Sequence, residues 1–291
     1  MAHWRRNSHW GKIMKRIMPG CAALVLLCGA AAAQDDATRS ITQVTDDVYR
    51  FDNNFHVSWF AITDEGVVVG DPINQAAAEW LKAQIAERTD QPVRYMILSH
   101  SHGDHASGGQ VFEDTAEVVA HENATAHVEA GEVDTAMPDV TFADTHEFSL
   151  GGKTFELNYL GEGGHGDDLI ATVIRPDDVA VVVDVVNPER LPYQTIPAAS
   201  IDGYIGQIRA VEALDFETLL PGHSKTGTRA DATATIEYLE LLRQRVQERL
   251  DAGDDLEQIK AAVTMPEYAD WGSYEQFIGL NVEGMVGHLS N

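Results

Sequence analysis

Residues 100–105 read His100-Ser101-His102-Gly103-Asp104-His105, and this stretch decides how the rest of the chain is interpreted. It follows an apolar run, Val93–Leu98, that is typical of a buried strand. At the end of a strand His100 and His102 can point to one side, while a turn at Gly103 brings Asp104 and His105 to an adjacent position. Imidazole nitrogens and carboxylate oxygens are ligands for Zn²⁺ and related divalent ions. The stretch therefore predicts part of a metal site.

Three more ligand-type residues lie at or near the ends of apolar strands further along the chain. His165 lies in a glycine-rich loop, residues 161–166, and Asp184 interrupts the apolar run 181–186, where an unpaired charge is costly. His223 follows a short predicted strand that ends at Pro221-Gly222. A loop histidine or a satisfied buried aspartate is the alternative for each residue alone. Four independent strand ends that each present a ligand favour a shared metal site.

The remaining pattern indicates one α/β domain with a mixed sheet system covered by helices. Strands are expected at Val44–Phe51, His56–Thr63, Val67–Gly70, Val93–Leu98, Glu117–Ala120, Phe155–Leu160, Leu169–Ile174, Val179–Val186 and Thr218–Leu220. Helices are expected at Ala76–Arg88, Ile201–Leu214, Ala230–Leu250, Leu256–Val263 and Tyr274–Leu289. The run Val179–Val186 is almost continuously apolar, which predicts burial on both faces of the strand.

The charge balance of the chain limits its partners. There are 20 Lys+Arg against 46 Asp+Glu, a formal net charge of -26. Such a surface repels phosphate backbones and anionic lipid, so we expect neither a nucleic-acid nor a membrane partner. A small-molecule substrate is the expected partner, and the oligomeric state is left open.

The first 33 residues are typical of a cleaved signal peptide. A basic segment without acids precedes the apolar run Cys21–Ala33, which is too short to span a bilayer, and Ala31-Ala32-Ala33 supply the small residues of a cleavage site. The expected product is a single periplasmic or secreted domain over residues 34–291, with 15 basic and 46 acidic side chains and a net charge of -31. Because Cys21 and Cys28 leave with the leader, thiolate ligands, a thiol nucleophile and disulfides are excluded.

The H-x-H-x-D-H stretch, completed in order by His165, Asp184 and His223, resembles the signature of the metallo-β-lactamase-fold hydrolase superfamily. The resemblance covers nearly all of the chain after the leader. It implies a four-layer αβ/βα sandwich with two mixed β-sheets and a dinuclear site at one edge of them. It also implies a ligand set: His100, His102 and His165 for the first metal, Asp104, His105 and His223 for the second, and Asp184 bridging both. Two Zn²⁺ ions are expected, with iron or manganese as possible occupants.

In such a site, a hydroxide shared by two Zn²⁺ ions attacks a carbonyl carbon, and Asp104 orients the nucleophile and shuttles its proton. The expected activity is hydrolysis of an ester, lactone or lactam bond in a small molecule. Asn187 stands where cysteine-dependent β-lactamases of the superfamily carry a lysine, and the Asp184 bridge is similar to that of lactonases and thioesterases. The segments Pro188–Tyr193 and 221–229 resemble an exported bacterial branch.

Two other classes remain open: a mononuclear-iron oxidoreductase similar to sulfur dioxygenases, and a non-catalytic periplasmic metal-binding accessory protein. Metal identity and oxygen consumption separate the first from a hydrolase. Structural zinc sites usually have four ligands, and seven ligands in two sets speak against the second.

Residues outside the ligand set carry weaker expectations. His56, Trp59 and Tyr193 are candidate substrate contacts, with plain packing as the alternative. Asp71 is either a support for the metal ligands or a helix cap. Many members of the superfamily have Thr after the third histidine ligand, whereas Gly166 and Asp167-Asp168 follow His165 here, a departure that affects its expected support. Structural or surface roles are expected for four other histidines, namely His121, His127, His146 and His288.

Overall fold

A computed structural model describes residues 36–290 of the chain. The predicted leader, residues 1–33, lies outside the described residues. From Ala37 onward the chain belongs to one compact unit. Within the described part, no helix has both the length and the apolar character needed to cross a membrane.

The N-terminal half builds a seven-stranded mixed sheet. Its strands follow one another in space as they do in sequence. They are antiparallel from β1 to β4 and parallel from β4 to β7. The strands are β1 (Arg39–Gln43), β2 (Val48–Asn53), β3 (His56–Thr63), β4 (Gly66–Val69), β5 (Val93–Ile97), β6 (Glu117–His121) and β7 (Val140–Phe142).

A second, five-stranded sheet follows, in the order β12-β11-β10-β9-β8. All its pairs are antiparallel except β11 with β12, so this sheet is mixed as well. Its strands are β8 (Thr145–Leu150), β9 (Lys153–Tyr159), β10 (Ile170–Arg175), β11 (Val179–Val182) and β12 (Thr218–Pro221).

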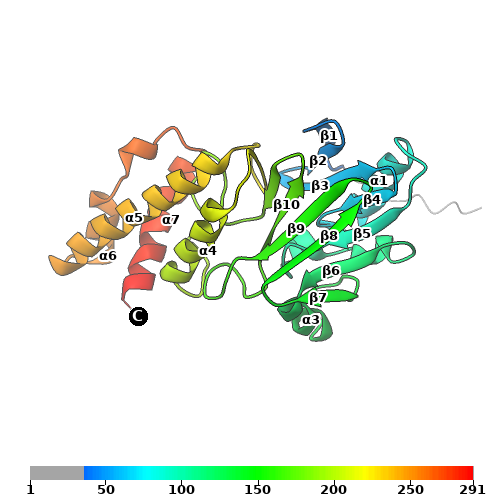
Figure 1. The fold of residues 1–291 in the computed structure, drawn as a ribbon. Helices are drawn as coiled ribbons and strands as arrows, with labels where there is room; N and C mark the ends of the chain where they lie inside the picture. The colour runs from blue at the N-terminus through cyan, green and yellow to red at the C-terminus, as the bar shows by residue number, and fades with distance from the viewer. Residues whose placement is uncertain (1–35, 291) are drawn as a thin grey trace, which may run out of the picture. The chain divides into compact units, whose positions relative to one another are not determined.

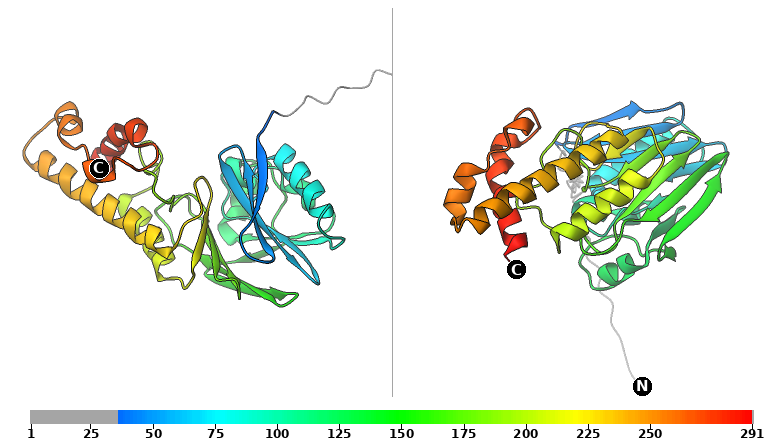
Figure 2. Two further views of the ribbon diagram at one scale, coloured as in Figure 1. Left: turned by 90° about the horizontal axis from the view of Figure 1, so that it is seen from above. Right: turned by 60° about the vertical axis from the view of Figure 1, so that its left-hand side comes forward.

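The helices fall into two groups, one on the outer side of each sheet (Figures 1 and 2). The first group is α1 (Gln75–Ala86), the short α2 (Gly103–Ala106), the 3-10 turn η1 (Gly109–Phe112) and α3 (Glu122–Glu129). The second is α4 (Ile201–Ala213), α5 (Arg229–Asp251), α6 (Leu256–Ala262), the 3-10 turn η2 (Pro266–Tyr268) and α7 (Tyr274–Leu289). In the second group α6 and α7 pack against α5 and lie farther from the sheet (Figures 1 and 2).

Three separate hydrophobic clusters show the order of the layers. One cluster lies between the sheets and joins Trp59 of β3 to Phe155 of β9. A second joins the outer face of the first sheet to Leu81 of α1. The third joins the second sheet to Leu239 of α5 and neighbouring helices. Truncating one such fully buried leucine to alanine costs about 2–5 kcal/mol of stability. The fold is therefore the expected four-layer αβ/βα sandwich with two mixed sheets.

The strand prediction differs from the structure most clearly at two places. The expected strand Val44–Phe51 begins only at Val48, because residues 44–47 turn between β1 and β2 and Val44 N–H donates to the Val48 carbonyl at 2.8 Å. The expected strand Val179–Val186 is buried throughout β11 but ends at Val182. Asp184 then adopts a φ of 65°, which takes the chain out of the sheet. Strands β1, β7 and β8 and helix α3 were not predicted.

Candidate metal centre

The His100–His105 stretch connects the end of β5 to α2 and is held at both sides by buried carboxylates. Asp71 Oδ1 accepts a hydrogen bond from Ser99 N–H at 2.7 Å, and Asp168 Oδ2 accepts one from Ser101 N–H at 2.7 Å. Burial raises the pKa of both carboxyl groups. Asp71 Oδ2 also lies 3.9 Å from His105 Nδ1, whereas the cap of α1 is Asn74. Asp71 therefore supports the ligand loop and is not the helix cap.

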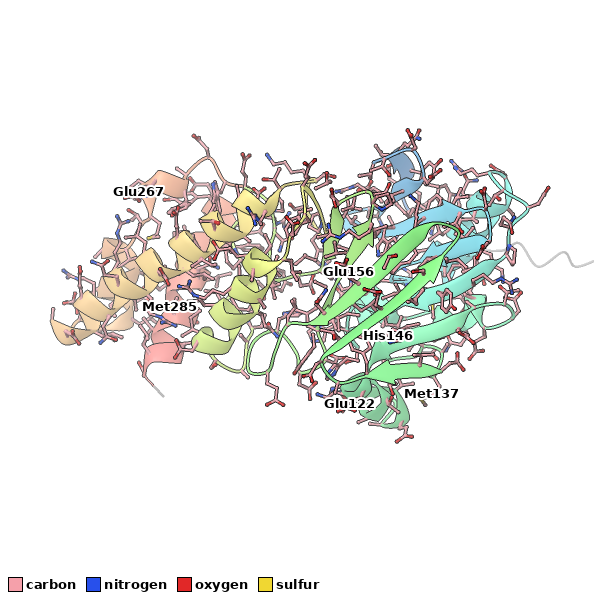
Figure 3. All side chains as sticks on the ribbon, in the orientation of Figure 1. Glu122, Met137, His146, Glu156, Glu267 and Met285 are labelled. Atoms are coloured by element: carbon pink, nitrogen blue, oxygen red, sulfur yellow. The ribbon has the colours of Figure 1, made fainter. Side chains whose placement is uncertain are left out.

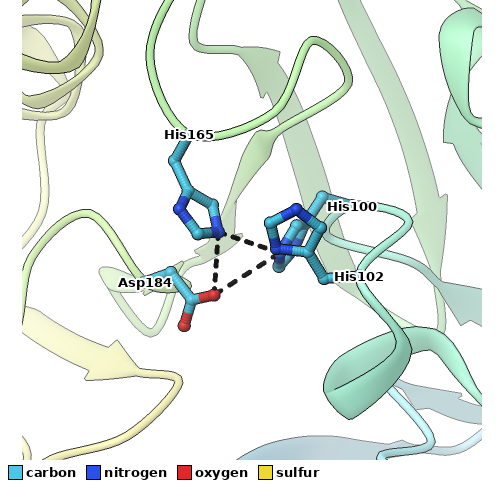
Figure 4. Close-up of side chains that lie close together, drawn as sticks. All are labelled: His100, His102, His165 and Asp184. Carbon is cyan, nitrogen blue, oxygen red and sulfur yellow. Dashed lines mark hydrogen bonds and ion pairs between the residues drawn. The ribbon is translucent and has the colours of Figure 1, made fainter. Parts of the chain in front are cut away.

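Four side chains meet in what we call the three-histidine cluster: His100, His102 and His165 with Asp184 (Figure 4). Asp184 Oδ2 lies 3.0 Å from His165 Nε2 and 3.4 Å from His100 Nε2, and the two ring nitrogens are 3.3 Å apart. Burial lowers the pKa of His100 to about 3 and also lowers that of His102. Both imidazoles are therefore neutral at pH 7, the form that binds a metal.

The other oxygen of Asp184 faces a second group, the Asp104 cluster, made of Asp104, His105 and His223. Asp184 Oδ1 lies 3.2 Å from His105 Nε2 and 3.1 Å from His223 Nε2, while these two nitrogens are 3.0 Å apart. Asp104 Oδ2 lies 3.6 Å and 3.5 Å from the same two nitrogens. The structure thus brings all seven predicted ligand residues together, with Asp184 between the two clusters.

His56, at the start of β3, lies against the Asp104 cluster. Its Nε2 is 3.5 Å from Asp104 Oδ2, and its ring meets that of His223 edge-on with centroids 4.9 Å apart. The neighbouring Val57 N–H donates to the Gly222 carbonyl at 2.7 Å, which ties β3 to the loop carrying His223. The sequence predicted His56 only as a substrate contact. The structure places it beside the carboxylate of Asp104, a candidate metal ligand. His223 and His56 together hold the pKa of Asp104 well below its usual range.

Local backbone features explain why Asp184 and His223 can approach so closely. Asp184 is a non-glycine residue at φ 65°, a strained conformation that is typical of functional sites. Asn187 Nδ2 donates to the Asp184 carbonyl at 3.0 Å and so stabilises this turn. A Cβ on Gly222 would lie 2.9 Å from the His105 ring and 3.0 Å from Asp184 Oδ1. Only glycine therefore fits immediately before His223.

The loop carrying His165 is supported by Gln207 of α4, a residue that the sequence argument missed. Gln207 is 1% exposed; its Oε1 accepts from His165 N–H at 2.7 Å, and its Nε2 donates to the Gly161 carbonyl at 2.8 Å. In this chain Gly166, Asp167 and Asp168 follow His165, where many members of the superfamily have a threonine. Two residues provide support in this region. Gln207 supports His165, and Asp168 holds the His100–His105 loop.

The donor set fits metal ions better than it fits a hydrogen-bonded core. Asp184 Oδ1 is buried and has no hydrogen bond of regular geometry, although two ring nitrogens face it. Burial would raise the pKa of Asp184, but the surrounding histidines lower it well below its usual value. Despite burial, the carboxylates of Asp104 and Asp184 raise the pKa of His223 to about 9 and also raise that of His105. Nitrogen and oxygen donors in two sets around one carboxylate are compatible with a dinuclear metal site.

The centre opens into a cavity of about 320 Å³. Ligand residues from both clusters form one side of it, and Phe55, Leu191, Tyr193 and Pro197 contribute an apolar wall. Tyr193, a predicted substrate contact, thus lines the cavity beside the candidate ligands. Trp59 does not line this cavity: it is 3% exposed and stacks on Phe155 between the sheets, with ring centroids 6.1 Å apart. Plain packing accounts for Trp59.

Helix α7 fixes the backbone of the cavity wall. The fully buried Asn281 donates to the carbonyls of Pro192 and Gln194 at 2.9 and 2.6 Å, and it accepts from the Tyr238 hydroxyl at 2.7 Å. A Cβ on Gly284 would lie 1.9 Å from the Thr195 carbonyl oxygen, so this close approach requires glycine. Nothing in the sequence pattern relates these residues, which lie about ninety positions apart.

Apart from His56, the four other histidines of the described residues that lie outside the ligand set have structural surroundings. His121 stacks on Tyr159. His146 lies on β8 (Figure 3) and stacks on Phe142, and His288 lies 3.0 Å from the Ile196 carbonyl. His127 lies with Asp167 and Asp168 in a group that could also hold a cation. Glu132 and Asp167, however, raise the pKa of His127 to about 9, so it is a protonated partner of carboxylates.

Comparison with known proteins agrees with this architecture. A family model of the metallo-beta-lactamase superfamily matches residues 53–223, and the chain belongs to this superfamily. A similar solved structure is a metallo-beta-lactamase from Pontibacter korlensis, with a TM-score of 0.63, 20% identity, and coverage of 70% of this chain and 99% of that one. At this identity the likeness shows the fold.

A curated relative is the 2,4-dinitroanisole O-demethylase subunit alpha of Nocardioides sp. (strain JS1661). It is 25% identical over 199 residues, which cover 67% of this chain. The match spans 60% of that relative's length.

Proposed function

We propose that the protein is a hydrolase with two zinc ions that cleaves an ester, lactone or lactam bond in a small molecule. One observation carries the proposal: the two oxygens of Asp184 face different histidine clusters, Oδ2 toward His165 and Oδ1 toward His223. A carboxylate in this position suits two adjacent ions better than one. The superfamily membership and the open cavity beside the centre support an enzyme over an accessory protein.

Bound zinc ions would supply Lewis acidity and lower the pKa of water toward about 7. The chain's own residues then have separate tasks. Asp104 stays ionised because His56 and His223 hold its pKa low, so its carboxylate accepts the hydrogen bond of an attacking water and orients it. Tyr193 lies across the cavity, and its hydroxyl accepts from Gln194 Nε2 at 2.9 Å, which leaves its proton free to stabilise an oxyanion.

The curated relative motivates a second candidate. That protein is named for O-demethylation of an aryl ether, and the apolar wall of the cavity would accommodate an aromatic ring. Cleavage of an activated aryl methyl ether therefore belongs in any substrate panel. Iron chemistry with oxygen is a further outcome that the same panel can detect.

The test uses protein loaded with zinc and a pH-stat, because ester, lactone, lactam and thioester hydrolysis all release acid. The proposal expects acid release from at least one substrate and its loss, by about a hundredfold or more, in Asp104→Asn. Asp114→Asn is the matched control, since Asp114 is an exposed partner of Lys82 and does not line the cavity. Acid release that is equal in all three proteins would refute the role of Asp104. Methanol release from an aryl ether would assign ether cleavage to the protein instead of hydrolysis at a carbonyl carbon. Oxygen uptake by the iron-loaded protein would assign oxygen chemistry instead.

We further propose that the protein is exported, that residues 1–33 are removed, and that residues 34–291 act as a single domain. The basic and apolar segments of the leader support this. N-terminal sequencing of protein recovered from the periplasm or medium should start at Gln34. Recovery of the full-length chain from the cytoplasm would refute export.

A further inference from the structure

Arg190 lines the same cavity as the metal ligands and is partly buried there. It stands six positions after Asp184, on the segment that leads from the centre into the apolar wall. An arginine side chain carries a positive charge, so the cavity contains one such charge.

Within residues 36–290, Arg190 has no carboxylate partner, although the chain has 46 acidic residues against 20 basic ones. Its neighbour Glu189 is engaged elsewhere, in an ion pair with Lys225. Other arginines in the described part of the chain do have carboxylate partners; these are Arg50, Arg175, Arg209, Arg243, Arg245 and Arg249. Arg88, Arg94 and Arg229 also lack a carboxylate partner, but among the described arginines only Arg190 lines this cavity.

The backbone around Arg190 is fixed before any ligand arrives. Gly272 N–H donates to the Glu189 carbonyl at 2.8 Å, and Leu191 N–H donates to the Gly272 carbonyl at 3.1 Å. A guanidinium on a held backbone loses less freedom on binding than one on a mobile loop.

The apolar wall gives the other half of the recognition. Phe55 and Tyr193 are 61% and 58% exposed, and among the described residues they are two of the three large hydrophobic side chains with such exposure. Both line this cavity, while the third, Met137, does not. Exposed aromatic side chains around a cavity are typical of a ligand site.

We propose that the substrate is a monoanion, with an apolar or aryl body against Phe55 and Tyr193 and one carboxylate paired with Arg190. The proposal rests on the hydrolase function, since it assumes that the cavity receives the substrate. A single guanidinium matches one carboxylate in a two-point hydrogen-bonded pair.

A binding experiment tests the proposal without requiring turnover. Zinc-loaded protein is titrated calorimetrically with 4-phenylbutanoate and with its neutral amide, which differ only in charge at one end. We expect the carboxylate to bind at least about tenfold more tightly than the amide, because one charge-assisted hydrogen-bonded pair contributes an affinity difference of this size. In Arg190→Gln this preference should fall to about threefold or less, whereas Arg190→Lys should retain part of it. Arg209→Gln is the control, because Arg209 pairs with Glu240 on the surface.

The outcomes separate this proposal from the hydrolase function. A carboxylate preference that survives unchanged in Arg190→Gln would overturn it, because the metals alone would then hold the anion. The absence of any preference in the unsubstituted protein would overturn it too. Failure to hydrolyse any ester in the pH-stat would refute the hydrolase, while the Arg190-dependent preference would still identify an acid-binding cavity.

Discussion

The three-histidine cluster and the Asp104 cluster share one carboxylate but differ in their affinity for protons. Burial lowers the pKa of His100 to about 3 and also lowers that of His102. His105 and His223, in contrast, face two carboxylates, and the pKa of His223 rises to about 9. The first cluster is therefore ready for a metal at neutral pH, while the second must release protons to bind one.

For two bound divalent ions, this difference predicts that the three-histidine cluster fills first. A divalent ion bound by the three-histidine cluster neutralises part of the Asp184 charge. That change weakens the attraction that holds protons on His105 and His223, and so favours the second ion. Substitutions in and around the two clusters, and a change of pH, should alter metal binding to different extents.

Asp184→Asn should have the largest effect, because both clusters lose their common negative oxygen ligands. We expect metal content at pH 8 to fall from two ions to one or fewer. Hydrolytic activity should fall by about a thousandfold or more, the scale of several kcal/mol of transition-state stabilisation. Elemental analysis after dialysis, together with the pH-stat assay, measures both quantities. Two ions retained in Asp184→Asn would contradict the bridging position.

Lowering the pH should empty the Asp104 cluster first. Below about pH 9, protons compete with a metal ion for His223. For each proton that must be released, the metal affinity of this cluster should fall by about tenfold when the pH falls by one unit. His100, with its pKa of about 3, is a neutral imidazole between pH 5.5 and 8.5 and has a nitrogen lone pair available for a metal. Metal content should drop from two ions to one as the pH falls across that range. Simultaneous loss of both ions would show that the clusters do not differ in this way.

His56→Ala should have a smaller effect, confined to the second ion. Removing the side chain takes away the partner that lies 3.5 Å from Asp104 Oδ2, so this carboxylate is less well oriented. Loss of such an outer contact lowers metal affinity by about 10–100-fold. Competition with a chromophoric chelator gives the two affinities separately.

Gln207→Ala is the matched variant for the other cluster, since Gln207 holds the His165 loop. It should weaken the first ion by a similar factor. If both variants weaken the same ion, the division into two clusters is wrong.

Asn281→Ala should leave metal content unchanged and act on the cavity wall alone. Its buried hydrogen bonds to the Pro192 and Gln194 carbonyls would be lost, leaving unsatisfied groups that cost about 1–3 kcal/mol each. We expect a lower melting temperature and weaker binding of 4-phenylbutanoate at full metal content. Metal loss in this variant at a temperature where it stays folded would mean that α7 also supports the centre.

The sequence predicted the layers and the residues of the two clusters because local signals mark them. Ligand-type side chains followed apolar runs, and those runs became strands whose ends meet. The contacts of Gln207 and Asn281 carried no such signal, because each reaches a backbone carbonyl or N–H more than forty positions away. His56 and Trp59 could not be distinguished by pattern, since both lie on β3 and only packing separates the cavity from the core.

Anomalous X-ray diffraction from crystals of the zinc-loaded protein at pH 8 would show whether Asp184 lies between two metal ions. We expect two peaks about 3.5–4 Å apart. One peak should lie among His100, His102 and His165, and the other beside His105 and His223. A single peak, or a second peak distant from Asp184, would contradict the account.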